Sequence, residues 1–101
     1  MIRFEVSNEL LSQFRESIGD YTPDVQMDKY YKNFLTMAMS DLITDDIDKR
    51  TLSSSELGKA TTCLYAEALM NKTDIATNPT ISLLRNKLAL ISKGDKYDVQ
   101  Q

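Results

Sequence analysis

The residues of this chain whose types and spacing could bind a cation are four aspartates within one short segment: Asp41, Asp45, Asp46 and Asp48. Carboxylates at alternating positions are typical ligands of Ca²⁺, but a calcium-binding EF-hand loop also needs glycine at its sixth position and glutamate at its twelfth. Counted from Asp46, those positions hold Thr51 and Leu57. We therefore interpret the segment as a solvated charged loop and expect no metal site there, the alternative being a weak cation site.

The remaining side chains offer little for catalysis. The chain has no histidine and one cysteine, Cys63. This composition excludes a Ser-His-Asp triad, a Cys-His pair, an imidazole metal site and a disulfide within the chain. The serines at 53–55 are explained by helix capping, and no glycine-rich phosphate loop, H-E-x-x-H or C-x-x-C motif occurs. We expect a protein that is not an enzyme, with no catalytic residue and no cofactor.

The length and charge of the chain limit further what kind of protein it can be. With 101 residues, 42% apolar and 27% charged, the chain fits one soluble globular domain. A net charge of -3 argues against the phosphate backbone of nucleic acid as the main ligand. No apolar run is long enough for a signal peptide or a membrane span, and a lone cysteine fits a reducing compartment. The location expected from composition is therefore the cytoplasm.

Four segments repeat apolar residues at helical spacing, which predicts an all-α domain of four helices over residues 1–94 and a flexible tail over residues 95–101. The helices are expected at about residues 7–17, 23–43, 53–70 and 79–92. Ser7 or Asn8 can cap the first helix at its start, and Gly19 suits its end. Lys93 and Gly94 are expected to end the last helix.

The other helix starts are also marked. Thr22 before Pro23, and Asn78 before Pro79, each combine a capping residue with proline at the first helical position. Ser53 with Glu56 predicts a capping box at the start of the third helix.

The second helix is expected to be the longest and the central element, because its apolar arc spans roughly 200° at 100° per residue. The predicted core combines residues from all four helices: Leu11, Phe14, Tyr31, Phe34, Leu35, Ala38, Leu42, Leu57, Leu64, Ala68, Leu84 and Leu88.

The last helix carries a second apolar signal. Its core stripe is Ile81, Leu84, Leu88 and Ile91. Leu83 and Leu90 are seven residues apart and lie on nearly the opposite face. They are either scattered surface leucines or a seam that faces a partner. We name this pair, together with Tyr97 and Val99 in the tail, as the candidate partner-binding residues.

The order of these features resembles one family. The sequence Asp20-Tyr21-Thr22-Pro23-Asp24 precedes the long second helix, Leu64 to Lys72 ends the third, and Asn78-Pro79-Thr80 opens a leucine-rich last helix. Over about residues 5–97 this layout resembles the head–tail connector proteins of tailed bacteriophages, also called head-completion or adaptor proteins. Two features depart from the family pattern. An arginine is common there where this chain has Lys72, and many members carry a longer insertion between the second and third helices.

The resemblance implies a small, helical, non-enzymatic virion protein that is present in the host cytoplasm during assembly. It would form a ring of copies beneath the portal after DNA packaging, and the isolated protein could be a monomer. Its partners would be other copies of itself, the portal protein, and the next stopper or tail protein, with no membrane contact. DNA would pass through the ring without sequence-specific binding, which an acidic subunit favours.

Two other classes fit the composition. An acidic helical domain with no site of its own also suits an inhibitor or immunity protein that blocks a toxin or host enzyme. Self-association or portal binding would distinguish a connector from such an inhibitor, which would bind one foreign enzyme. A helical regulator that contacts nucleic acid is the weakest alternative, because the chain has no basic stripe.

Overall fold

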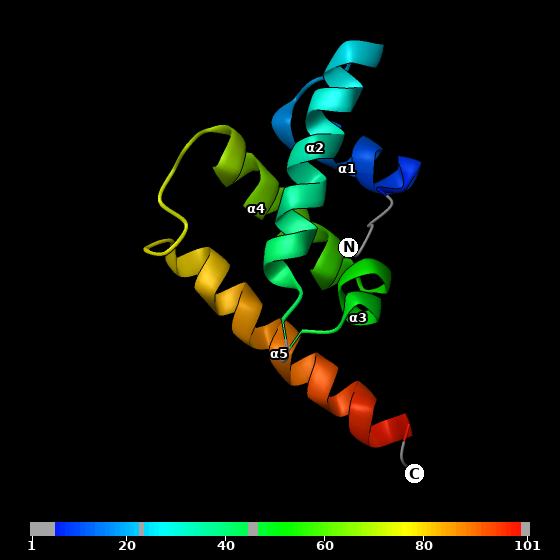
Figure 1. Cartoon of the computed structure of the whole chain (residues 1–101), viewed down its shortest axis with the longest axis vertical. Coiled ribbons are helices and arrows are strands. Elements are labelled where there is room, and N and C mark those ends of the chain that lie inside the picture. Colours follow the sequence, from blue (N-terminus) through cyan, green and yellow to red (C-terminus); the bar gives the residue numbers. More distant parts are fainter. Residues whose placement is uncertain (1–5, 23, 45–46, 100–101) are drawn as a thin grey trace.

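The computed structural model describes residues 6–22, 24–44 and 47–99, and side chains of the last helix as far as residue 93. Across these residues the fold is all-α, as predicted, and contains no strand. Five helices follow one another along the chain: α1 (Asn8–Ile18), α2 (Val25–Leu42), α3 (Lys49–Ser54), α4 (Glu56–Met70) and α5 (Pro79–Val99) (Figure 1).

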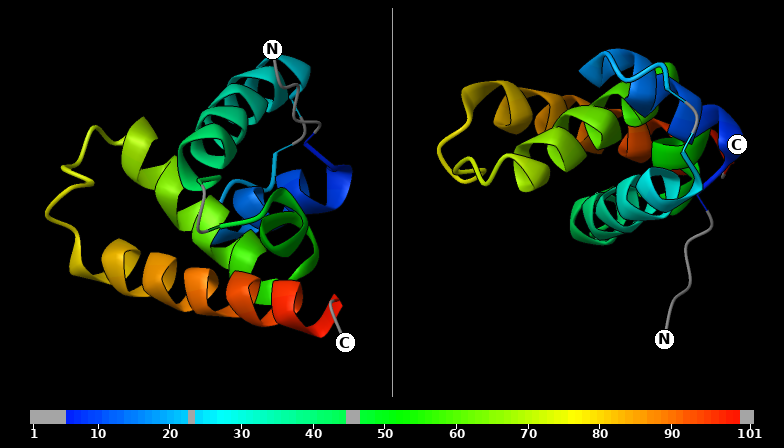
Figure 2. Two further views of the ribbon diagram at one scale, coloured as in Figure 1. Left: turned by 60° about the horizontal axis from the view of Figure 1, so that its bottom comes forward. Right: turned by 90° about the horizontal axis from the view of Figure 1, so that it is seen from above.

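The centre of the fold is α4, which contacts each of the other four helices. In both views of Figure 2, α2 and α5 lie on opposite sides of α4. The prediction that the second helix would be the longest and central element was therefore wrong. α5, with 21 residues, is longer than α2, with 18. The small residues of α4 suit a central helix, because they let its neighbours approach closely.

Local signals correctly marked both ends of α1. The Ser7 hydroxyl accepts a hydrogen bond from the Leu10 amide at 3.1 Å. At the other end Gly19 has φ of 76°. The Gly19 amide donates a hydrogen bond to the Glu16 carbonyl, and the Asp20 amide donates to the Arg15 carbonyl. A left-handed residue with this pair of bonds satisfies carbonyls that the helix leaves unpaired.

The start of α2 differs from the prediction of a Thr22 cap. Asp24 is the capping residue, and its carboxylate accepts hydrogen bonds from the amides of Gln26 at 2.9 Å and Met27 at 3.3 Å. A carboxylate at this position also interacts favourably with the positive end of the helix dipole, an advantage that a threonine hydroxyl lacks. Pro23 lies outside the described residues.

The segment predicted to be a charged loop, residues 44–51, contains the start of the additional helix α3, which ends at Ser54. Ile47, Thr51 and Leu52 are buried, while Lys49 and Arg50 are exposed. Burial of these side chains against the other helices stabilises a six-residue helix that would be marginal alone.

The predicted capping box of Ser53 and Glu56 was also wrong. Ser53 lies inside α3 and donates to the Lys49 carbonyl at 2.9 Å. Ser55 is the cap of α4 and accepts from the Gly58 amide at 2.9 Å.

The last helix does not end at Lys93 and Gly94, because α5 continues to Val99. Its start agrees with the prediction. The Asn78 side chain accepts from the amides of Thr80 at 3.0 Å and Ile81 at 3.1 Å, and Pro79 occupies the first helical position. Residues 95–99, which were expected in a flexible tail, therefore belong to α5. Residues 100–101 and the side chains of residues 94–99 lie outside the described part.

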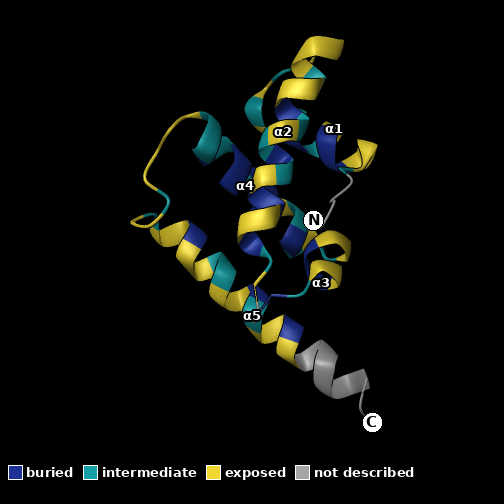
Figure 3. Cartoon of the chain, in the orientation of Figure 1, coloured by how far each residue is buried: buried dark blue, intermediate teal, exposed yellow. Residues whose placement is uncertain are grey.

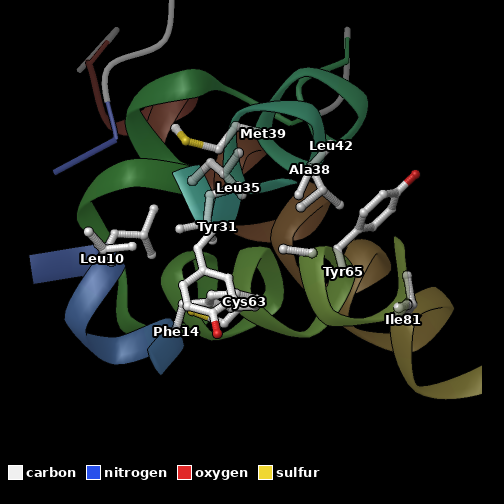
Figure 4. Packing of buried hydrophobic residues seen from close by; sticks show 14 of the residues in the cluster. Leu10, Phe14, Tyr31, Leu35, Ala38, Met39, Leu42, Cys63, Tyr65 and Ile81 are labelled. Carbon is white, nitrogen blue, oxygen red and sulfur yellow. The ribbon is translucent and has the colours of Figure 1, made fainter. Parts of the chain in front are cut away.

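The hydrophobic core lies between α4 and its neighbours (Figure 3). In Figure 4, Phe14 and Tyr31 meet beside Cys63, and the two rings make an edge contact with centroids 5.5 Å apart. Eight predicted core residues are buried: Leu11, Phe14, Tyr31, Leu35, Ala38, Leu42, Ala68 and Leu88.

Four other predicted core residues are only half-buried: Phe34, Leu57, Leu64 and Leu84. Phe34 packs against Tyr30 on the side of α2, with ring centroids 4.9 Å apart, and its helical position lies beside the core stripe instead of within it. The prediction of a central buried Phe34 was therefore wrong.

Candidate functional site

The first candidate surface is the outer face of α5, formed by Leu83, Lys87 and Leu90. Leu83 is 54% exposed and Leu90 is 69% exposed. Both project about 140–180° away from Ile81 and Leu88, which are buried against the rest of the fold. This arrangement leaves two large apolar side chains in water on either side of a lysine.

The orientation of α5 differs slightly from the predicted stripe. Ile91 was expected in the core but is 39% exposed, and the buried position in that turn belongs to Ser92. The Ser92 hydroxyl accepts a hydrogen bond from the Asp48 amide at 3.1 Å, which joins α5 to the start of α3. This buried polar contact fixes the rotation of α5 and turns Ile91 outward.

The other two candidate residues, Tyr97 and Val99, belong to the last turns of α5. Their side chains fall outside the described part of the molecule. The candidate surface is therefore built on Leu83 and Leu90 alone.

Beside α5 lies a hollow that the sequence did not indicate. It has a volume of about 330 Å³, and we call it the α4 groove because most of its lining comes from that helix. The lining comes from α1, α4 and α5 and consists of Gln13, Ser17, Ala60, Cys63, Leu64, Glu67 and Leu84. It is the side of α4 between α1 and α5, where Ala60 is left exposed.

The α4 groove contains one charged side chain, the half-buried carboxylate of Glu67, in a mainly apolar lining. Burial, and secondly the negative charge of Glu67, raise the pKa of the Cys63 thiol to about 11. The thiol is therefore protonated at neutral pH and is a weak nucleophile. The groove thus suits the binding of an apolar surface that carries a positive charge, and thiol chemistry is disfavoured there.

A second apolar surface lies along one edge of α2, formed by Tyr30, Phe34 and Met37. Tyr30 is 45% exposed and Met37 is 50% exposed. This surface was not predicted from the sequence, because a broad apolar arc such as that of α2 is typical of a helix buried on more than one side. The spacing of four and three residues along this edge was the available signal, since it repeats the pattern of a helix–helix seam.

The acidic segment does not form a metal centre in the part of it that is described. The Asp41 carboxylate accepts a hydrogen bond from the Tyr65 hydroxyl at 3.1 Å, and Asp48 lies at the start of α3. Asp45 and Asp46 lie outside the described residues. Among the described residues, no three cysteine, aspartate or glutamate side chains gather closely enough to hold a metal ion.

Tyr31 and Asp20 form a hydrogen-bonded pair beside the end of α1. The Tyr31 hydroxyl donates to the Asp20 carboxylate at 2.5 Å. This bond is the main cause that raises the pKa of Tyr31 to about 12, and it also lowers the pKa of Asp20. The pair fastens the turn after α1 to the core side of α2, so its role is structural.

Comparisons with protein-family models, with curated proteins and with solved structures find no match to this chain. In the part of the chain that is described, no helix is long and apolar enough to cross a membrane. The features of this structure that bear on function are therefore three surfaces: the outer face of α5, the α4 groove and the exposed edge of α2.

Proposed function

We propose that this protein is a head–tail connector of a tailed bacteriophage, a structural virion protein without enzymatic activity. It would assemble in the host cytoplasm as a ring beneath the portal after DNA packaging. In the virion it would join the portal to the stopper or tail protein.

The observation that carries this proposal is the presence of exposed apolar residues on two helices that lie on opposite sides of α4. Leu83 and Leu90 are exposed on α5, and Tyr30 and Met37 are exposed on α2. Contiguous exposed apolar side chains on a small protein mark contact surfaces. A ring subunit needs two different surfaces for its neighbours, and a connector needs further contacts above and below the ring. An inhibitor that plugs one enzyme needs a single surface.

The charge distribution supports a passive role toward DNA. The chain has a net charge of -3, which disfavours retention of a polyanion. The three cations of residues 79–93 are Arg85, Lys87 and Lys93, and they project about 80° or more apart around α5. They therefore do not form the single basic stripe that nucleic-acid binding requires. We propose that DNA passes through the ring without sequence-specific contacts.

The test is co-sedimentation with portal rings made from the portal gene of the same phage genome. We expect the purified protein to sediment with the rings and to add a layer of density beneath them in negatively stained images. Bovine serum albumin serves as the unbound control. Failure to bind portal rings, together with tight one-to-one binding and inhibition of a toxin or host enzyme, would replace the connector proposal with an inhibitor.

A further inference from the structure

The α4 groove and the outer face of α5 belong to the same molecule, but they cannot contact each other within one copy. Leu84 lines the groove, whereas its neighbour Leu83 points about 100° further around α5 and into solvent. We propose that the α4 groove receives the outer face of α5 from a second copy of this chain. This inference rests on the proposed function, because it names the contact between neighbouring subunits in the ring.

The two surfaces match in length. Leu83 and Leu90 are seven residues apart on α5, which corresponds to about 10.5 Å along the helix axis. Ala60 and Glu67 are also seven residues apart on α4, and both line the groove. Because Ala60 is small and exposed, a neighbouring helix can approach α4 closely at that position.

The two surfaces also match in charge. Lys87 lies between Leu83 and Leu90 on the outer face of α5. Glu67 is the charged residue of the groove lining. Residues 79–93 contain three cationic residues and no acidic residue, so this part of the approaching helix carries a net positive charge. A lysine–glutamate contact flanked by apolar packing fixes the orientation of two helices and disfavours wrong pairings.

The contact is head-to-tail, because one copy contributes its α5 outer face and the other contributes its groove. An interface of this kind leaves a free groove and a free α5 face at the two ends of every pair. Addition of further copies closes into a ring when the rotation between neighbours allows it. This is the assembly that a connector beneath a portal needs.

The experiment uses two variants that each block one surface. Leu83→Asp with Leu90→Asp removes the apolar contacts of α5, and Ala60→Arg fills the groove. Val25→Asp and Ala76→Arg are matched controls, because both residues are exposed and lie outside the two surfaces. Melting curves establish that each variant is folded. Sedimentation velocity over a wide concentration range, with and without portal rings, then measures self-association.

We expect each blocked variant to lose about 30-fold or more in the association constant, because each places an unpaired charge in a buried apolar contact. The two controls should behave as wild type. An equimolar mixture of the two blocked variants should form one-to-one pairs and nothing larger, because only one compatible groove and one compatible face remain. A symmetric interface would give no such complementation.

Charge reversal gives a second test that leaves the apolar packing intact. Lys87→Glu and Glu67→Lys should each weaken self-association, and the double variant should restore it. If wild type assembles but the blocked and charge-reversed variants assemble equally well, the inference is wrong and the connector proposal stands. If wild type associates neither with itself nor with portal rings, the connector proposal fails and this inference fails with it.

Discussion

At Gly58 the backbone of α4 lies close to the backbone of Leu52 in α3, and replacement of this glycine by alanine tests the packing between the two helices. A Cβ atom at Gly58 would lie 2.7 Å from the carbonyl carbon of Leu52 and 2.8 Å from its Cα. Both are backbone atoms, so relief of the overlap requires α3 to move away from α4. α3 also contacts α5, and the movement would strain the hydrogen bond from the Asp48 amide to Ser92.

The change in the free energy of unfolding expected for Gly58→Ala is the difference between two opposing effects. Overpacking of a tight contact costs about 1–3 kcal/mol, and backbone overlap lies at the upper end of that range. Replacement of glycine by alanine inside a helix stabilises the helix by about 1 kcal/mol. We therefore expect Gly58→Ala to lower the free energy of unfolding by about 2 kcal/mol, which corresponds to a melting temperature lower by about 8–16 °C in a domain of this size.

Urea denaturation followed by circular dichroism at 222 nm measures this free energy. Ser12→Ala is the control, because Ser12 is an exposed residue in the middle of α1 and reports the effect of helix propensity alone. It should be neutral or stabilising by a few tenths of a kcal/mol. Should Gly58→Ala prove as stable as this control, or more stable than wild type, the close approach of α3 to α4 would be refuted.

Three further predictions concern the helix caps, the core and the stability in acid. Ser55→Ala should cost about 1 kcal/mol through loss of the α4 cap, whereas Ser53→Ala should cost less than about 0.5 kcal/mol in the same denaturation assay. The reverse order would restore the capping box expected from sequence. Phe14→Ala should cost about 3–5 kcal/mol because its ring is fully buried, and Phe34→Ala should cost about 1–2 kcal/mol because its ring is half-buried. Equal costs would contradict this assignment. The lowered pKa of Asp20 means that its stabilising effect is present above its unfolded pKa near 3.9 and is lost as the pH falls through its folded pKa. Asp20→Asn should therefore reduce the acid-side slope of unfolding free energy against pH, and an unchanged slope would exclude the hydrogen bond from the tyrosine hydroxyl.

The start of α4, which was predicted at the wrong serine, shows that a capping signal alone does not fix where a helix begins. Ser53 and Ser55 are both serines near the start of an apolar repeat, and both satisfy the local rules for a cap. Their roles are set by α3, which places Ser53 inside a helix and leaves Ser55 with extended backbone. α3 in turn depends on burial of Leu52 against the rest of the fold, which no local pattern reveals.

The exposed edge of α2 shows the same limit in the core. Tyr30, Phe34 and Met37 share a broad apolar arc with Leu35, and sequence periodicity treats the whole arc alike. Which part becomes buried depends on where α1 and α4 cover α2. They cover the side that carries Leu35 and leave the opposite edge of the arc half-exposed or exposed.

The sequence was sufficient to predict the all-α class, the approximate positions of four helices, a cap of the first helix at Ser7 or Asn8, its end at Gly19, the cap at Asn78, and the outward position of Leu83 and Leu90. Each of these depends on hydrogen bonds or periodicity within a few residues along the chain. The central position of α4, and the groove on its side between α1 and α5, became evident from the packing of the helices in three dimensions. A groove exists where neighbouring helices fail to cover a surface, and that depends on contacts between residues distant in the sequence.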